Sequence, residues 1–165
     1  MYLSQLKWLK NVKTDDGWAY SNPNEMPIPE ARIFRLHWRN FEDKSNAQKP
    51  HKDELMLLIQ KAKVTHIVEF LDDEVYEIED KEWNVYRIVR AVWMPLNNFD
   101  WEKLPHQREF FGYDYVVGDG LAHSLSDPDR MWLFHEHWDK LGGLTAFQKH
   151  LGDMLTNISK PVCDA

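Results

Sequence analysis

Cysteine is almost absent from this sequence of 165 residues, which contains one thiol, Cys163. A single cysteine cannot form an internal disulfide or supply the paired thiolates of a structural zinc site, and such sparse use is typical of a reducing compartment. A cysteine nucleophile also needs a fixed base beside it, whereas the last residues of a chain are usually mobile. Cys163 is therefore a poor candidate for catalysis.

Long apolar runs are missing as well. No stretch approaches the roughly 20 apolar residues that a membrane-spanning helix requires. The opening residues, MYLSQLKWLK, lack the uninterrupted apolar segment and the small-residue cleavage site of a secretory signal. We therefore expect a cytoplasmic location and no membrane partner.

The common phosphate-binding and nucleophile motifs are not found either. Gly118-Asp119-Gly120 is an isolated turn signal without the spaced glycines and the lysine that cradle phosphates, and no GxSxG elbow occurs. The nearest approach to a metal motif is His135-Glu136-His137. On a helix these two histidines lie about 200° apart, so they cannot chelate one ion. We expect no metal, no cofactor and no catalytic residue from these motifs.

The chain is, by contrast, rich in apolar and aromatic residues. Hydrophobic residues make up 43% of it and aromatic residues 13%, including eight Trp. This is enough to build a sizeable core, and the length suits one ordinary domain over residues 1–165. Trp and Tyr carry polar groups that need partners when buried, so we expect some of these rings to line a pocket or an interface.

The middle of the chain contains four apolar stretches of strand character. Apolar and polar residues alternate over 34–39, which predicts a strand with one buried face. Residues 55–59 are apolar on both faces, as in a central strand. Two further strands are predicted at 64–70 and 85–94, the second of which is closed by a proline.

The two ends of the chain differ from this strand core, which occupies 31–95. Residues 1–30 contain leucines near helical spacing, which favour a short helix although a strand is possible, and then a proline-rich loop. Residues 96–125 are a mixture of loop and helix. Residues 126–160 contain two apolar stripes at helical spacing, separated by Gly142-Gly143, and predict a helical hairpin. The pattern indicates an α+β fold in which helices pack at the C-terminal end of a small, twisted or barrel-like, mostly antiparallel sheet of about five strands.

Charge is distributed unevenly along the chain. Residues 31–63 carry eight Lys or Arg against four Asp or Glu, whereas residues 69–82 carry eight acidic residues against Lys81 alone. This pattern predicts a sheet with one basic, aromatic-bearing edge and one acidic hairpin. The total charge of −7 opposes nonspecific attachment to a polyanion.

The basic segment offers the residue types that bind nucleotides. Bases stack on Trp faces while Lys and Arg meet phosphates, a combination that suits single-stranded or flipped nucleotides. The candidates are Arg35, Trp38, Arg39 and Asn40 at the end of the first predicted strand, followed by Gln48, Lys49 and Lys52 in the next loop. Trp38 is either the last core residue of that strand or the first wall of a site.

The order of these segments resembles a known family. The run RIFRLHWRNF, KPHKDELMLLIQ, KVTHIVEFL and WNVYRIVRAVWM is similar to small PUA-like barrels, particularly the EVE and YTH-like branch. Members of that branch bind RNA or modified bases in an aromatic pocket. The resemblance covers about residues 32–94 and implies that Trp38 and Asn40 lie near the pocket, with Lys49 and His66 beside them. Lys52-Asp53 stands where the family usually shows Gly-Asp.

Three functions are compatible with the sequence. The first is a non-enzymatic module that binds single-stranded or modified nucleic acid, or a nucleotide, in an aromatic pocket beside a basic loop. The alternative is a protein-interaction module whose acidic hairpin and exposed aromatic residues meet a basic partner. The third is a metal-dependent nuclease that uses Glu79 and Lys81, with Asp53 or Glu69 as a further carboxylate.

Overall fold

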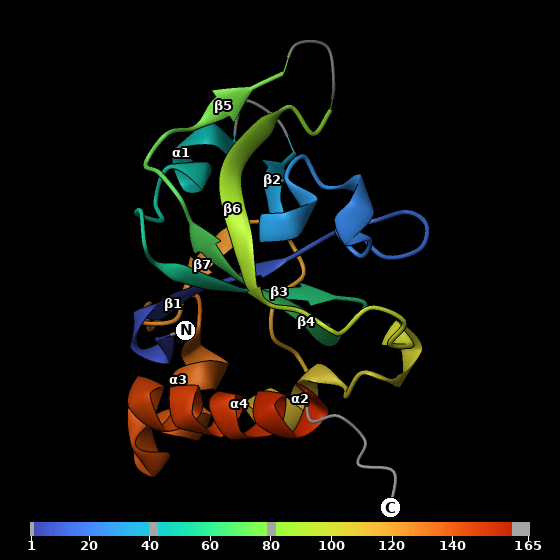
Figure 1. Cartoon of the computed structure of the whole chain (residues 1–165). Coiled ribbons are helices and arrows are strands. Elements are labelled where there is room, and N and C mark those ends of the chain that lie inside the picture. Colours follow the sequence, from blue (N-terminus) through green and yellow to red (C-terminus); the bar gives the residue numbers. More distant parts are fainter. Residues whose placement is uncertain (1, 40–42, 79–81, 160–165) are drawn as a thin grey trace, which may run out of the picture.

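A computed structural model of the chain describes residues 2–39, 43–78 and 82–159. Figure 1 shows a strongly curled sheet above a layer of helices. The strands are β1 (Leu6–Asn11), β2 (Ile33–Trp38), β3 (Leu55–Gln60), β4 (Lys63–Phe70), β5 (Tyr76–Glu77), β6 (Val85–Trp93) and β7 (Ala122–Ser124). They form one sheet in the order β2-β6-β4-β3-β1-β7, with β5 paired to β6. The fold is therefore α+β, and its sheet is a half-barrel.

The sheet is mixed rather than fully antiparallel. Strands β1 and β3 pair in parallel, whereas every other pair of strands in the sheet is antiparallel. The four strands expected in the middle of the sequence are all present at nearly the expected positions. Strand β3 is buried at all six positions, which agrees with its apolar sequence and its central place.

The helices lie mostly toward the C-terminus, as expected. They are α1 (Lys44–Ala47), α2 (Gln107–Phe111), α3 (Trp132–Trp138) and α4 (Gly143–Ser159). In Figure 1 the last three lie together against one side of the sheet. Helix α4 contributes the buried residues Phe147, Leu151 and Leu155 to the core that it shares with the sheet. None of the helices in the described part of the chain is both long and apolar enough to cross a membrane.

The N-terminal segment is a strand, and the expected helix is not formed. A short 3₁₀ turn, Leu3–Gln5, leads directly into β1. Leu6 and Leu9 are both fully buried in the same core cluster although they are three residues apart. A bulge between Leu6 and Trp8 shifts the pairing register, which brings the two leucines to one face. This spacing imitates the period of a helix in the sequence.

Two hydrophobic clusters lie on opposite sides of the sheet. One joins the sheet to helices α2, α3 and α4, and the other fills the concave side of the half-barrel. The second cluster includes Phe34, Leu36 and Trp38 from β2, all at most 3% exposed. The rim of the concave side is closed by the loop that precedes β2 and by the segment that follows β6. These two connections form the candidate site.

Candidate functional site

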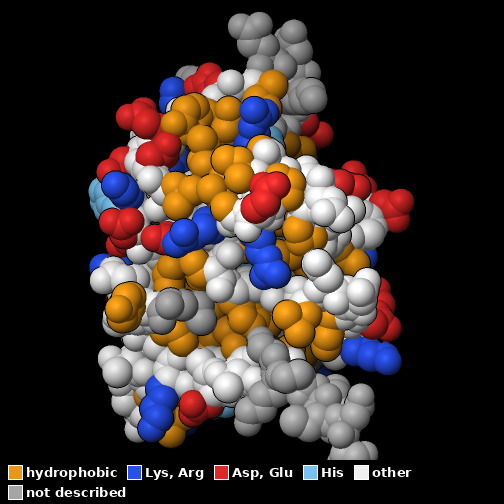
Figure 2. Space-filling model, viewed as in Figure 1, with side chains coloured by type: hydrophobic (Ala, Val, Ile, Leu, Met, Phe, Trp, Pro, Cys, Tyr) orange, Lys and Arg blue, Asp and Glu red, His pale blue; other side chains and the backbone are white. Residues whose placement is uncertain are grey.

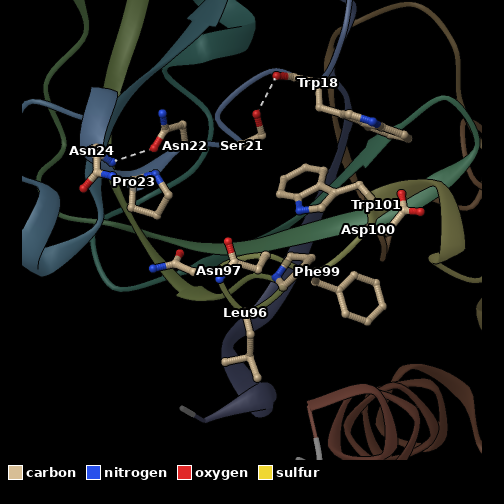
Figure 3. A pocket seen from close by; sticks show the side chains of 12 residues that line it. Trp18, Ser21, Asn22, Pro23, Asn24, Leu96, Asn97, Phe99, Asp100 and Trp101 are labelled. Carbon is tan, nitrogen blue, oxygen red and sulfur yellow. Dashed lines mark hydrogen bonds between the residues drawn. The ribbon is translucent and has the colours of Figure 1, made fainter.

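The connections before β2 and after β6 enclose a pocket of about 510 Å³, here called the Trp18–Trp101 pocket. It is lined by Trp18, Ser21, Asn22, Pro23, Asn24, Pro95, Leu96, Asn97, Asn98, Phe99, Asp100 and Trp101. The rings of Trp18 and Trp101 lie 5.6 Å apart between centroids, at an angle of 56°. Figure 3 shows these indoles on one side, the Asn22–Asn24 turn on the other, and Asn97 between them. Flat apolar walls are thus combined with amide groups.

Local capping interactions shape both walls. The Asn22 Oδ1 atom accepts a hydrogen bond from the backbone N–H of Asn24 at 3.0 Å, which starts a short 3₁₀ turn at Pro23. On the other wall, Asp100 Oδ1 accepts from the N–H of Glu102 at 3.0 Å and starts the turn that carries Trp101. Both turns therefore follow directly from Asx residues in the sequence.

Three buried polar residues hold the Trp18 wall from beneath. Gln60 binds the backbone of Ala19 twice, with its Oε1 accepting at 2.8 Å and its Nε2 donating at 2.9 Å. Gln60 Nε2 also donates to Thr65 Oγ1, which lies 2.9 Å from His66 Nδ1. The opposite ring nitrogen of His66, Nε2, lies 2.8 Å from the carbonyl of Tyr20. A continuous hydrogen-bond chain thus joins β3 and β4 to the loop.

This hydrogen-bond chain explains the backbone geometry and the protonation of His66. Tyr20 adopts a positive φ of 56°, a left-handed conformation that is unfavourable for an aromatic residue unless the surroundings impose it. The carbonyl of Tyr20 requires a proton on Nε2, so Nδ1 accepts from Thr65 and the imidazole is neutral. Complete burial lowers the pKa of His66 to about 4. His66 therefore acts as a positioning residue beneath the pocket.

Acidification should loosen this loop through His66. The unfolded chain takes up a proton at His66 as the pH falls through about 6.5, whereas the folded protein resists protonation until its pKa of about 4. The free energy of unfolding should therefore fall as the pH drops from about 6.5 to 4. In His66→Gln this part of the pH dependence should disappear, as measured by urea unfolding at several pH values. An unchanged slope in His66→Gln, with His51→Gln as an exposed control, would contradict this assignment.

A cation stands over the aromatic wall. The Nζ atom of Lys61 lies 4.7 Å from the centroid of the Trp18 ring. Such a cation–π contact favours one orientation of the indole. On the inner side, the ring of Trp101 meets His66 edge-on at 5.4 Å. The pocket therefore has two fixed indoles and a positive charge at its border.

A second pocket of about 290 Å³ adjoins the first one. The two share Trp18, Ser21 and Asn22, and the second also reaches Arg35 and His37 on β2. Arg35, one of the residues expected from the sequence to bind a ligand, is exposed, and its guanidinium carbon lies 4.9 Å from the Tyr86 ring centroid. Arg35 therefore lies beside the loop of the Trp18–Trp101 pocket but does not line that pocket.

The structure does not bring the other expected residues together around one pocket. Trp38 is fully buried and donates through Nε1 to Asn46 Oδ1 at 2.9 Å, so it presents no stacking face to solvent. Arg39 is exposed and forms an ion pair with Glu82 at 3.0 Å. Lys49 lines a separate pocket of about 310 Å³ between α1 and β7. Asn40 lies outside the described residues.

The residues considered for metal chemistry fall into two groups. Glu79 and Lys81 lie outside the described residues. Glu69 forms an ion pair with Arg90. Within residues 2–39, 43–78 and 82–159, no group of three or more His, Cys, Asp or Glu is arranged to hold a metal ion.

The main walls of the pocket were not identified from the sequence. Trp18, Phe99 and Trp101 come from connecting segments, and hydrophobic periodicity gives no information on such segments. A usable signal exists nonetheless. The segments WAYSNPN and PLNNFDW, which carry the two walls, each combine Trp with Asn and a proline, a composition typical of turns.

Comparison of the chain with protein-family models, with curated proteins and with solved structures finds no match. A function for this chain therefore depends on the chemistry of the pockets themselves.

Proposed function

We propose that the protein binds a nucleobase, as part of a single-stranded nucleic acid or a nucleotide, in the Trp18–Trp101 pocket and does not transform it. The observation that carries this proposal is the pairing of two indoles with side-chain amides in one hollow of about 510 Å³. Every base has a π-face that stacks on an indole. Amides of Asn donate and accept, as the edges of a base require.

The geometry of the two indoles favours one flat ligand inside the pocket. Their ring centroids lie 5.6 Å apart with the planes tilted by 56°, so the two indoles contact one another and form one continuous aromatic wall for a flat ligand. The amides of Asn22, Asn24, Asn97 and Asn98 line the rest of the pocket. Lys61 beside Trp18 adds a positive charge where a phosphate backbone would pass.

The proposal includes membership of the PUA-like class. A curled mixed sheet with one parallel pair, and an aromatic pocket formed by the connections at its rim, support this assignment. The site differs from the one that the resemblance implies, because Trp38 is replaced in the stacking role by Trp18 and Trp101. The single cysteine of the chain supports a cytoplasmic location within the same proposal.

The test is a binding titration with a matched Trp control. Fluorescence anisotropy should be measured with short labelled single-stranded oligonucleotides, with and without modified bases. Stacking contributes roughly 1–3 kcal/mol per base, so Trp18→Ala should weaken binding by about tenfold or more. Trp132→Ala, which removes an indole that is 58% exposed on α3, should bind like wild type. If wild type binds no oligonucleotide, or if Trp18→Ala binds equally well while folded, the proposal is wrong.

A second candidate function is supported by the hairpin formed by β5 and β6. Tyr76 and Tyr86 stack there at 5.3 Å with an angle of 16° between their planes. Figure 2 shows hydrophobic side chains gathered on this face, with charged side chains around them. Asp72 accepts a hydrogen bond from the Tyr76 hydroxyl at 2.7 Å and belongs to the acidic run. This surface suits a basic protein segment, and a cationic peptide that binds wild type but not Tyr76→Ala would favour it.

A further inference from the structure

Lys10 on β1 is buried without a paired anion. Only 1% of this residue is exposed, and its Nζ atom donates a hydrogen bond to the carbonyl oxygen of Gly120. The rings of Trp38 and Trp83 lie 4.9 Å and 5.9 Å from Nζ, measured to their centroids. In the described part of the chain, no carboxylate forms an ion pair with Lys10. A buried ammonium in this state is costly to the folded protein.

A small open pocket lies next to this lysine. Its volume is about 150 Å³, and it is lined by Lys10, Val12, Lys13, Ala19, Tyr20, His37 and Trp83. A Cβ atom placed on Gly120 would lie 3.8 Å from Lys13 Cε and 3.8 Å from the outer edge of the Trp83 ring. Lys13 and the Trp83 indole therefore lie close to Gly120, whose carbonyl oxygen binds Lys10. Among the residues that the structure describes, the lining contains two amines and no carboxylate.

The surroundings of Lys10 bring the equilibrium between its ammonium form and its neutral amine form close to neutral pH. The pKa of Lys10 is lowered to about 7, mainly because the residue is buried and to a small extent because of the neighbouring charge of Lys13. Asp43 and Asp119 act in the opposite direction. The carboxylate of Asp119 lies 2.8 Å from His123 Nε2, so it is already engaged with another partner. An anion bound in the pocket would stabilise the charged form of Lys10.

We propose that the pocket beside Lys10 binds an oxyanion, through the amines of Lys10 and Lys13. The pocket shares Tyr20 and His37 with the 290 Å³ pocket, which in turn adjoins the Trp18–Trp101 pocket. The three hollows thus follow one loop. The natural anion is a phosphate of the strand whose base occupies the Trp18–Trp101 pocket. This last identification rests on the proposed function, whereas the anion site itself does not.

The anion site is tested with sulfate, whose charge stays constant around neutral pH. Calorimetric titrations of the full chain should show binding that weakens by about tenfold per pH unit above pH 7, because the anion requires the ammonium form of Lys10. Lys10→Met should abolish both the binding and its pH dependence. Lys13→Gln should weaken sulfate binding severalfold. Because Lys13 is exposed, this variant should fold, so it tests the anion site even if Lys10→Met does not fold. His37→Gln should retain the pH dependence, which separates Lys10 from this histidine.

The controls separate the anion site from the base pocket. Lys149→Gln, on the exposed side of α4, should leave sulfate binding unchanged. Trp18→Ala should retain sulfate binding while it loses oligonucleotide binding. Wild type that binds sulfate but no oligonucleotide would contradict the proposed function and leave the anion site standing. Absence of sulfate binding, or equal binding by folded Lys10→Met, would overturn the anion site. If folded Lys10→Met bound the oligonucleotide as tightly as wild type, the natural anion would not be a phosphate of the bound strand.

Discussion

Replacing Trp38 by alanine is expected to lower the free energy of unfolding by about 3–5 kcal/mol. The indole is fully buried in the cluster that fills the half-barrel. Its Nε1 donates to Asn46 Oδ1, which also accepts from the backbone N–H of Ala122 at 2.7 Å. The substitution therefore removes a large core side chain and one of the two donors to a side chain that joins α1 to β7. Urea unfolding followed by far-ultraviolet circular dichroism measures the change.

The matched control for this substitution is Trp132→Ala. Trp132 is 58% exposed, and surface substitutions usually change stability by less than about 0.5 kcal/mol. A small effect in both variants would show that Trp38 is not a core residue. If Trp38→Ala also lost oligonucleotide binding, Trp38 would be a pocket residue, as the sequence resemblance implies.

Arg87 should be equally important for stability, although it is charged. It is fully buried on β6, where Nη1 donates to the carbonyls of Ala47 and Pro50 at 2.8 Å and 2.7 Å. Nη2 donates to the carbonyl of Asp72 at 2.6 Å, and the guanidinium lies 4.6 Å from the Phe70 ring centroid. Arg87→Met retains the stem but leaves three carbonyls without this donor. Since each unsatisfied buried group costs about 1–3 kcal/mol, we expect a loss of about 3 kcal/mol or more.

The neighbouring Arg90 supplies the control for Arg87. It is exposed on the same strand and forms an ion pair with Glu69. Exposed ion pairs contribute about 0–1 kcal/mol, so Arg90→Met should have a small effect. Equal losses of stability in the two variants would contradict the view that Arg87 fastens the loops around β6.

The sequence predicted the centre of the fold well because burial there is regular. Strand β3 is buried on both faces and β2 and β6 alternate, so their patterns have a single interpretation. Strand β1 was ambiguous because its bulge produces a helical spacing of leucines. Strand β7 is only three residues long, and it pairs with β1, which is far away in the sequence. No local pattern could reveal that pairing.

The candidate pocket could be predicted from the sequence only in its residue types. The sequence led us to expect aromatic and polar side chains beside one another, and it placed Trp38 among them, although the position of Trp38 at the end of an alternating strand is equally compatible with the core. The actual walls depend on Gln60, Thr65 and His66, which fix the Trp18 loop from strands distant in sequence. The sequence shows that polar residues occur in these apolar strands, but it does not reveal which distant backbone segment their side chains bind.

The most direct test of base binding in the Trp18–Trp101 pocket is nuclear magnetic resonance of the indole N–H groups during an oligonucleotide titration. The chain has eight Trp, and single substitutions assign their signals. The signals of Trp18 and Trp101 should shift most. Trp138, whose indole N–H donates to the Phe111 carbonyl at 2.9 Å within the helical core, should stay unchanged. Shifts confined to Trp132, or no shift at all at saturating oligonucleotide, would contradict binding in this pocket.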